Sequence, residues 1–303
     1  MNYSAIILAA GKGTRMKSEL PKCVYPFFGK PMITYIIHSC KKAGIDDICV
    51  IVGHKKEIIK NILHDDVEYA YQEEQLGTGN AVKCANEFYS TRTGITLIFP
   101  GDMPLVDSKT IEDLINQHIE SGNDLTVVTT IVNNPTGYGR IVRKSGQVKK
   151  IVEEKDATCS QKDIKEINTG LYCINTELLD ETLGKIKNNN AKNEYYLTDI
   201  VEILGSTKKV NSFVVDEDFR LTGINDLFTL SQVEKQYQQL INKNHMLNGV
   251  HLINPDTILI EDTVEIEKNV TIDACSVIRG NTILRDGTYV EPFSLIIDGK
   301  KIK

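Results

Sequence analysis

Short apolar runs alternate, along the first hundred residues, with stretches that carry apolar residues at helical spacing. From Met32 to Cys40 the apolar positions recur every three or four residues, and Gly44 predicts the end of that helix. This alternation predicts an α/β fold, with a mainly parallel sheet, helices on both faces, and ligands at the carboxyl ends of the strands. The strands predicted from the apolar runs are residues 5–9, 48–52, 67–71 and 95–99.

The first domain continues through further β-rich runs at residues 126–132 and 171–174. We place its end at residue 225, so that residues 1–225 form one domain. Residues 226–249 then carry a single stripe of apolar side chains, which predicts a long linker helix between two domains.

Residues 250–303 change to a strict period of six, in which an apolar residue is followed by a charged one and then by small or turn residues. Repeats with an aliphatic interior row are typical of a β-solenoid, and six hexads at three per coil correspond to about two coils. An ordinary pair of alternating strands is the alternative, and six repeats in register argue against it. The hexad positions are Ile260, Ile266, Ile272, Ile278, Leu284 and Val290.

Charge and hydropathy exclude two classes of partner. The 303 residues carry a formal net charge of -6, with no basic stripe that could follow a nucleic acid backbone. No apolar stretch approaches the roughly 18 residues that span a bilayer, and the N-terminus lacks the features of a signal peptide. We therefore expect a cytoplasmic protein. Its seven cysteines are scattered without a C-x-x-C motif, so we expect neither disulfides nor structural zinc.

The segment LAAGKGTRMKSELPK, from Leu8 to Lys22, is the most informative part of the chain because it directly follows a predicted strand. Gly11 and Gly13 allow positive φ and a close approach of the backbone, so that successive N–H groups can point at phosphate oxygens. Arg15 and Lys22 add positive charge beside this turn, which suits a triphosphate that loses pyrophosphate.

A glycine-rich turn alone also fits a plain connection between a strand and a helix. Its spacing is neither that of the P-loop, G-x-x-x-x-G-K-[ST], nor that of the dinucleotide fingerprint, G-x-G-x-x-G. The turn therefore indicates neither a P-loop NTPase nor a dinucleotide-binding fold.

Further blocks make the signal specific. LAAGKGTRM, the pair Pro21–Lys22 and GKPM at Gly29 resemble the signature of nucleotidyltransferases that act on sugar phosphates. Over residues 3–295 the chain resembles the bacterial bifunctional N-acetylglucosamine-1-phosphate uridyltransferase/acetyltransferases, which implies a Rossmann-like nucleotidyltransferase domain followed by a left-handed β-helix. The other matching blocks are QEEQLGTGNA from Gln72, PGDMPL from Pro100, TGYGRI from Thr136, IVEEKDA from Ile151, INTGLY from Ile167 and NEYYLTDI from Asn193.

The resemblance implies a Mg²⁺-dependent enzyme that joins UTP to N-acetylglucosamine 1-phosphate and releases pyrophosphate. It implies Arg15 and Lys22 as catalytic residues. It also implies Asp102 and Asn225 as the metal ligands, whose hard oxygen donors suit Mg²⁺. The implied nucleotide-binding residues are Leu8, Ala9, Ala10, Gly11, Gly13, Gln72, Gly77 and Thr78, and the implied sugar-binding residues are Gly101, Gly139, Glu153 and Asn168.

Taken singly, these residues also have simpler interpretations. Asp102 follows the predicted strand at 95–99, where a ligand site is expected, but an Asp at such a strand end often caps a helix. Asn225 precedes the linker helix and fits a cap as well. Glu153 and Asn168 alone are unremarkable polar residues. We further expect Asp102 to be a surface carboxylate that contributes little to the core.

The reaction needs no general base, because the attacking oxygen belongs to a phosphate that is already anionic. The sugar phosphate is expected to attack the α-phosphorus in line, with Mg²⁺ bridging phosphate oxygens and Arg15 and Lys22 balancing the charge. Two rivals stay open. One is the same reaction with another hexose 1-phosphate or with dTTP, and the other is a non-catalytic protein that binds sugar nucleotides.

The chain departs from the resembled family in three places. Its β-helix of about two coils is shorter than the family's trimerising one, which leaves a homo-oligomer through this segment open. The tail IIDGKKIK carries none of the later acetyltransferase motifs, so we expect no acetyl transfer. Asn80 and Glu154 stand where the family often has His, which makes the base and the sugar less secure than the reaction class.

Overall fold

The structure is a computed structural model that describes residues 1–216 and 218–302 and divides into two compact units. The first unit combines Met1–Tyr25 with Pro31–Asp226. The second combines Pro26–Lys30 with the chain from Leu227 onward. The sequence pattern did not predict that residues 26–30 group with the second unit. No helix in the described part of the chain is long and apolar enough to cross a membrane.

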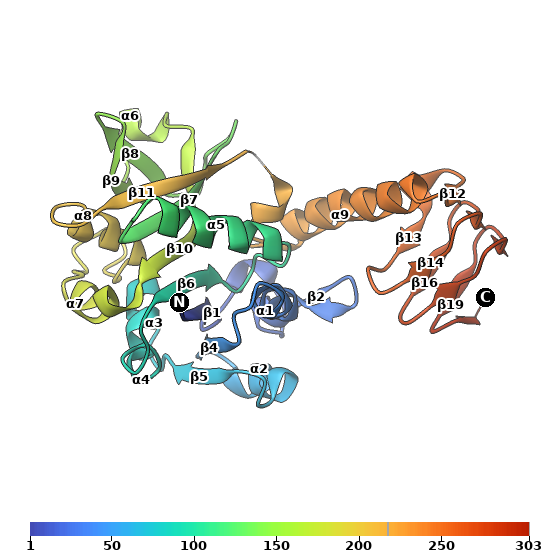
Figure 1. Cartoon of the computed structure of the whole chain (residues 1–303), viewed down its shortest axis with the longest axis horizontal. Coiled ribbons are helices and arrows are strands. Elements are labelled where there is room, and N and C mark those ends of the chain that lie inside the picture. The colour runs from blue at the N-terminus through green and yellow to red at the C-terminus, as the bar shows by residue number, and fades with distance from the viewer. Residues whose placement is uncertain (217, 303) are drawn as a thin grey trace. The chain divides into compact units, whose positions relative to one another are not determined.

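A nine-stranded sheet forms the centre of the first unit (Figure 1). Its main path runs β11-β7-β10-β6-β1-β4-β5, and β10 alone runs antiparallel to its neighbours on that path. The predicted α/β fold with a mainly parallel sheet is therefore confirmed. The strands on the path are β1 (Tyr3–Leu8), β4 (Asp47–Val52), β5 (Glu68–Tyr71), β6 (Ile95–Pro100), β7 (Leu125–Ile131), β10 (Glu166–Asn175) and β11 (Val210–Val215).

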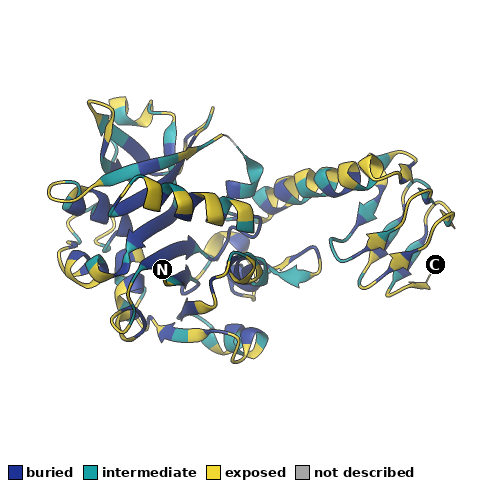
Figure 2. Ribbon diagram, viewed as in Figure 1, coloured by how far each residue is buried: buried dark blue, intermediate teal, exposed yellow. Residues whose placement is uncertain are grey.

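Helices cover both faces of this sheet because its central strands are apolar on both sides. Along β1, Ala5 and Ile7 join the apolar cluster on one face, while Ile6 joins the cluster on the other. Figure 2 shows these strands as the buried centre of the unit. The first cluster is closed by α1 (Met32–Lys42), α2 (Lys56–Leu63) and α5 (Ser108–Glu120), and the second by α3 (Thr78–Cys84), α4 (Asn86–Tyr89), α7 (Leu179–Gly184) and α8 (Ile200–Leu204).

The sequence pattern was incomplete for the later strands. We predicted a strand only at 171–174, but β10 begins at Glu166, because polar residues around a register shift interrupt its apolar pattern. The hairpin of β8 (Arg140–Lys144) and β9 (Gln147–Val152) was not predicted, since its charged residues leave it half-buried. Strand β11 was missed because the polar residues Asn211 and Ser212 interrupt its apolar pattern.

The second unit contains helix α9 (Leu227–Leu247) and a stack of short strands, which pair in parallel except for the last, β20 (Lys300–Lys301). Strand β13 pairs with β16 and β16 with β19, and each step joins residues 18 positions apart, such as Leu259 to Val277. This spacing is three hexads per coil, so the predicted short β-helix is confirmed. The strands are β12 (His251–Leu252), β13 (Leu259–Ile260), β14 (Glu265–Ile266), β15 (Thr271–Ile272), β16 (Val277–Arg279), β17 (Ile283–Leu284), β18 (Tyr289–Val290), β19 (Leu295–Ile297) and β20 (Lys300–Lys301).

The six-residue period marks the interior of the β-helix. Ile260, Ile272 and Ile278 are fully buried, and Leu284 and Val290 nearly so. Ile266 is only half-buried. The aliphatic row therefore packs coil on coil, as each repeat cannot bury its apolar face alone.

A chain of hydroxyl groups inside the sheet yields a stability test. Thr96 is fully buried, and its hydroxyl lies 3.0 Å from that of Ser4 and 2.9 Å from that of Thr176. Thr96→Val keeps the shape but leaves both partners short of a hydrogen bond, so we expect it to lower the free energy of unfolding by about 1–3 kcal/mol. Urea denaturation measures this loss, and Thr207→Val, at an exposed position, is the control. An equal effect of the two substitutions would contradict the buried chain.

Candidate active site

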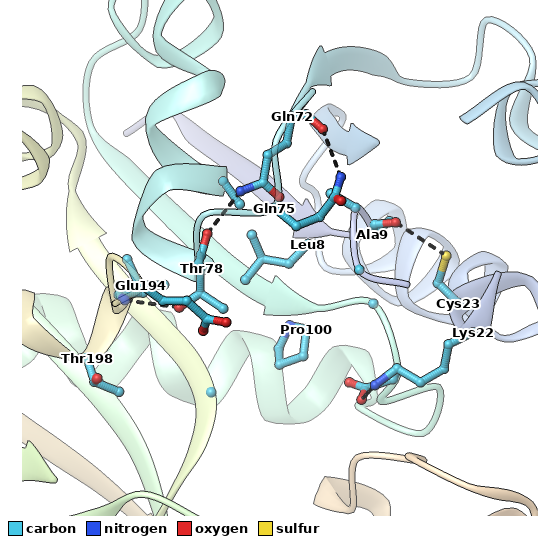
Figure 3. A pocket seen from close by; sticks show the side chains of 18 of the residues that line it. Leu8, Ala9, Lys22, Cys23, Gln72, Gln75, Thr78, Pro100, Glu194 and Thr198 are labelled. Carbon is cyan, nitrogen blue, oxygen red and sulfur yellow. Dashed lines mark hydrogen bonds and ion pairs between the residues drawn. The ribbon is translucent and has the colours of Figure 1, made fainter. Parts of the chain in front are cut away.

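A cavity of about 400 Å³ opens at the carboxyl ends of three parallel strands in the first unit (Figure 3). Leu8 ends β1, Gln72 follows β5 and Pro100 ends β6, and all three residues line the cavity. Parallel strands bring their carboxyl ends to the same edge of a sheet, and open α/β folds bind ligands at this edge. The cavity therefore lies where the fold class predicts a ligand site.

Most residues implied as site residues line this cavity. They are Leu8, Ala9, Ala10, Gly11, Lys22, Gln72, Gly77, Thr78, Gly101, Asp102, Glu153 and Asn168. Of the other four, Gly13, Gly139 and Asn225 adjoin lining residues, and Arg15 contacts Asn225. The structure thus brings the whole predicted set together, although two of its members, Arg15 and Asn225, lie 210 positions apart in the chain.

Lys22 holds a compact charge cluster at one end of the cavity. Its ammonium group is ion-paired with the carboxylate of Asp102 and donates a hydrogen bond of 3.0 Å to Asn225 Oδ1. Arg15 Nη2 donates to the same oxygen at 2.7 Å. Two cationic side chains therefore meet a carboxylate oxygen and an amide oxygen at a place where phosphate groups can be held.

Asp102 differs from its predicted environment. Only 12% of its side chain is exposed, so it is not a surface carboxylate, and burial of its charge is compensated by Lys22. It does not cap α5 either, because Asp107 does so by accepting a hydrogen bond of 2.8 Å from the backbone N–H of Thr110. The Asn225 side-chain oxygen, likewise, is engaged by Arg15 and Lys22.

The two glycines of the turn after β1 serve different purposes. Gly13 has φ +57°, as predicted, and a Cβ there would lie 2.7 Å from the Cβ of Lys22, so the turn needs glycine to pass this side chain. The prediction of positive φ was wrong for Gly11. A Cβ at Gly11 would meet no atom within 4 Å, so the space beside this cavity-lining residue is open to a ligand.

A second side of the cavity is formed by Gln72 and the loop that leads into α3. The Gln72 side chain is buried, and its Nε2 donates to the backbone oxygen of Gly77 at 3.0 Å and to Asn80 Oδ1 at 2.8 Å. Thr78 Oγ1 accepts a hydrogen bond of 3.0 Å from the backbone N–H of Leu197. In Figure 3, Gln72 and Thr78 border the cavity on a different side from Lys22.

The third side is formed where β10 breaks its register between Asn168 and Tyr172. Gly170 has φ +89° there, and its N–H donates to Asn168 Oδ1 at 3.1 Å. Asn168 Nδ2 donates to the hydroxyl of Tyr172 at 2.8 Å, and its backbone N–H donates to the oxygen of Gly139 at 2.9 Å. The bulge thus fixes the direction of one polar side chain at the cavity.

Glu153 supplies a carboxyl group to the same side. Burial raises its pKa above the usual value for Glu, although the hydroxyl of Thr198 donates to its Oε1 at 3.3 Å and opposes that shift. Only one hydrogen bond from a side chain satisfies this group in the described structure. Glu153 therefore has capacity to accept hydrogen bonds from the hydroxyl groups of a sugar.

Glu154, by contrast, does not line the cavity. Its Oε2 accepts hydrogen bonds from Arg140 Nη2 at 2.6 Å and from the N–H of Gly137 at 3.1 Å. The hydrogen bond from Gly137 lowers the pKa of Glu154 most, and the hydrogen bond from Arg140 lowers it further. Glu154, which stands where the resembled family often has His, thus supports the β8–β9 hairpin and does not form a wall of the cavity.

Reasoning from strand ends missed part of the cavity. The segment before α8 returns to the site and contributes side chains that no strand-end pattern indicates, and only the block NEYYLTDI pointed to it. Burial raises the pKa of the Cys23 thiol to about 12, so this lining cysteine stays protonated and is not a nucleophile. The missed lining residues are Cys23, Gln75, Ala81, Pro100, Gly170, Tyr172, Glu194, Leu197 and Thr198.

Curated relatives of this chain include bifunctional GlmU proteins. The chain is 46% identical to that of Acholeplasma laidlawii over 247 residues, and 49% identical to that of Clostridium beijerinckii over 247 residues. Each alignment covers 81% of this chain and 54% of the relative. The GlmU protein of Clostridioides difficile is 46% identical over 249 residues, which is 82% of this chain and 54% of the relative. The chain thus spans about half the length of these relatives, and the resemblance inferred from its motifs is confirmed.

A solved structure supports the fold. A Bacillus anthracis protein assigned as a glucose-1-phosphate thymidylyltransferase, in complex with sucrose, superposes with a TM-score of 0.61 over 77% of this chain and 94% of its own. At 18% identity this likeness shows the fold alone. The model of the nucleotidyl transferase family matches residues 4–237, which is most of the chain and includes every residue of the cavity. The chain belongs to the nucleotidyl transferase family.

Proposed function

We propose that this protein is a UTP:N-acetylglucosamine-1-phosphate uridylyltransferase, which forms UDP-N-acetylglucosamine and pyrophosphate. The observation that carries the proposal is the three-sided cavity. It has a cationic end at Lys22, a second side at Gln72, and a third side with the polar groups of Glu153 and Asn168. A phosphate chain, a base and a sugar ring can each occupy one side. The similarity to bifunctional GlmU proteins supports the same substrates.

Nucleotidyltransferases of this family generally depend on a divalent metal ion. We propose Mg²⁺ held by Asp102 and Asn225. The residues fit such an ion, because a cation of the chain itself, the Lys22 ammonium, already lies against the oxygens of both. No group of three or more His, Cys, Asp or Glu side chains suitable for a metal occurs among residues 1–216 and 218–302. Two protein ligands suit Mg²⁺, which commonly completes its coordination with phosphate oxygens and water.

The residues of the chain contribute position and charge. Lys22 and Arg15 hold the triphosphate and balance negative charge that gathers on the leaving pyrophosphate. Glu153 and Asn168 hold the sugar ring so that its phosphate approaches the α-phosphorus from the side opposite the leaving group. A bound divalent ion supplies further neutralisation of the phosphate oxygens. No side chain needs to remove a proton, because the attacking phosphate oxygen is already ionised.

We assign a separate role to each of three consecutive segments of the chain. We assign the transfer reaction to residues 1–225, with 226–249 as a connecting helix and 250–303 as a β-helix outside the reaction. The cytoplasmic location, the absence of acetyl transfer and the oligomeric state remain predictions from the sequence. A role as a non-catalytic sugar-nucleotide-binding protein is disfavoured, because Lys22, Arg15, Asp102 and Asn225 are brought together in one cluster.

Pyrophosphate release tests the proposed function. Purified protein with Mg²⁺ is supplied with UTP, dTTP, CTP or GTP, and with N-acetylglucosamine, glucose or glucosamine 1-phosphate. We expect release with UTP and N-acetylglucosamine 1-phosphate. Another productive pair would retain the reaction class and change the substrate, while no release with any pair would favour the binding protein.

Asp102→Asn separates charge from shape at the metal site. The amide preserves the size of the side chain but removes the charge that pairs with Lys22, so kcat is expected to fall by roughly 10²–10³-fold. Steady-state pyrophosphate release measures the fall, and the melting temperature shows whether the fold is retained. Asp113→Asn, with the same change of net charge on the exposed side of α5, serves as the control. Full activity of Asp102→Asn would remove Asp102 from the site.

Deletion of residues 250–303 tests the assignment of the reaction to the first unit. Every proposed site residue lies at or before Asn225, within that unit, so we expect the rate of pyrophosphate release to be retained. The same deletion in the Asp102→Asn background controls for contaminating activity. Circular dichroism establishes that the shortened chain is folded. A folded but inactive product would show that the β-helix takes part in the reaction.

A further inference from the structure

A second cavity of the first unit, also of about 400 Å³, shares Glu153 with the active-site cavity. Its walls come from β9, from the loop that leads into α6 (Cys159–Lys162), and from α8, which packs against β9 (Figure 1). Four carboxylates line it, and we call it the acidic cavity. They belong to Glu153, Asp156, Asp199 and Glu202. Its volume lies in the range of sites that bind small molecules.

The acidic cavity holds more negative charge than the chain neutralises. Among the residues that the structure describes, none of the four carboxylates forms an ion pair. Asp156 accepts a hydrogen bond of 2.8 Å from a backbone N–H, whereas Asp199 and Glu202 accept none in the same part of the chain. Lys150 also lines the cavity, but it pairs with no carboxylate there. The cavity therefore attracts a cation.

Repulsion among the carboxylates acts on Asp199. Burial, and then the charges of Glu202, Glu153 and Asp156, raise the pKa of Asp199 to about 6. A positive charge between these groups would relieve their repulsion and stabilise the ionised forms.

The hydroxyl of Tyr196 is a second, independent sign of a ligand. Tyr196 lines the acidic cavity and is only 8% exposed, and its enclosed hydroxyl has no hydrogen-bond partner among the described residues. Burial, and then the charges of Asp156, Glu194 and Glu153, raise its pKa to about 12, so the hydroxyl lies near carboxylates of this cavity. An enclosed hydroxyl without a partner is costly, and a ligand that donates a hydrogen bond to its oxygen removes that cost.

The arrangement of the carboxylates favours an organic cation over a metal ion. Within the described residues, they do not form a group of three that could hold a metal. A linear amine carries its charges several bonds apart, so separate ammonium groups can each reach a different carboxylate. An ammonium group only donates hydrogen bonds, which matches carboxylates that only accept them and a hydroxyl oxygen that has lone pairs to offer.

We propose that the acidic cavity binds a linear organic amine with at least two ammonium groups, held by the four carboxylates and by the hydroxyl of Tyr196. This binding goes beyond the proposed function and does not depend on it. One consequence does rest on that function. Because Glu153 lines both cavities, a bound ammonium group would stabilise its ionised form, which accepts hydrogen bonds from a sugar.

The simpler alternative is a diffuse attraction of amines to a protein with a net charge of -6. Such attraction depends on the number of charges and is screened by salt. It does not depend on an uncharged hydroxyl. Tyr196→Phe removes only that hydroxyl and leaves every charge in place, so this substitution separates a built site from diffuse attraction.

The test is isothermal titration of spermidine into the full chain, without nucleotide or sugar phosphate, at an ionic strength of about 0.15 M to screen diffuse attraction. We expect saturable binding of one spermidine per chain. Tyr196→Phe should weaken it by about 3–10-fold, through the loss of one hydrogen bond. Asp199→Asn should weaken it by about tenfold or more, since a hydrogen bond to a charged group is lost. Asp113→Asn, which removes one charge on α5, is the matched control and should bind as the unmodified protein does.

Two further measurements keep the outcome clear. Circular dichroism shows that each variant is folded, and Glu202→Gln replaces Asp199→Asn if the latter does not fold. N1,N8-diacetylspermidine, which keeps the chain but loses two of the three charges, should bind at least about tenfold more weakly. Equal affinity of the unmodified protein, Tyr196→Phe and Asp199→Asn would overturn the proposal, as would displacement of spermidine by an equal concentration of Ca²⁺. Saturable binding by a protein that releases no pyrophosphate would refute the proposed function and leave this inference standing.

Discussion

The burial of Asp102 is the constraint on which the cavity depends. A carboxylate with so little exposure needs a cation, and Lys22 supplies it from the turn after β1. The same ammonium binds Asn225, which Arg15 also engages, so segments remote in sequence are held together by one cluster of charges. Phosphate groups and a metal ion would redistribute these contacts rather than assemble them, which is the preorganisation that charge-stabilising sites require.

The other two sides of the cavity are held by hydrogen bonds that use backbone atoms. Hydrogen bonds to Gly77 and Asn80 hold the Gln72 side chain, and a hydrogen bond from Gly170 in the β-bulge of β10 holds that of Asn168. Backbone partners cannot be altered by side-chain substitution, so they keep polar side chains directed into the cavity while the surrounding sequence varies.

Sequence reasoning succeeded where one local signal was sufficient. The strand-end position of Asp102 and the apolar run before it predicted a residue at the ligand-binding edge, and the cavity lies there. The period of six predicted the interior row of the β-helix from Ile260 onward. Sequence reasoning failed for Gly11, where glycine suggested a positive φ but the backbone does not adopt one. It also failed for Tyr172 and Thr198, whose approach to the cavity depends on a bulge and on a returning loop.

The sequence by itself determined the alternation of strands and helices, the edge of the sheet where a ligand binds, the repeat of the β-helix and, through its motifs, the family. These properties follow from periodicity and from local spacing, which are present in the order of the residues. Only the tertiary structure decided that Asp102 is buried against Lys22, that β10 runs antiparallel, and that the Gln72 amide donates to the backbone oxygen of Gly77. Each of these properties depends either on partners distant in sequence or on the direction of a single side-chain amide. Neither of these two causes leaves a periodic signal in the chain.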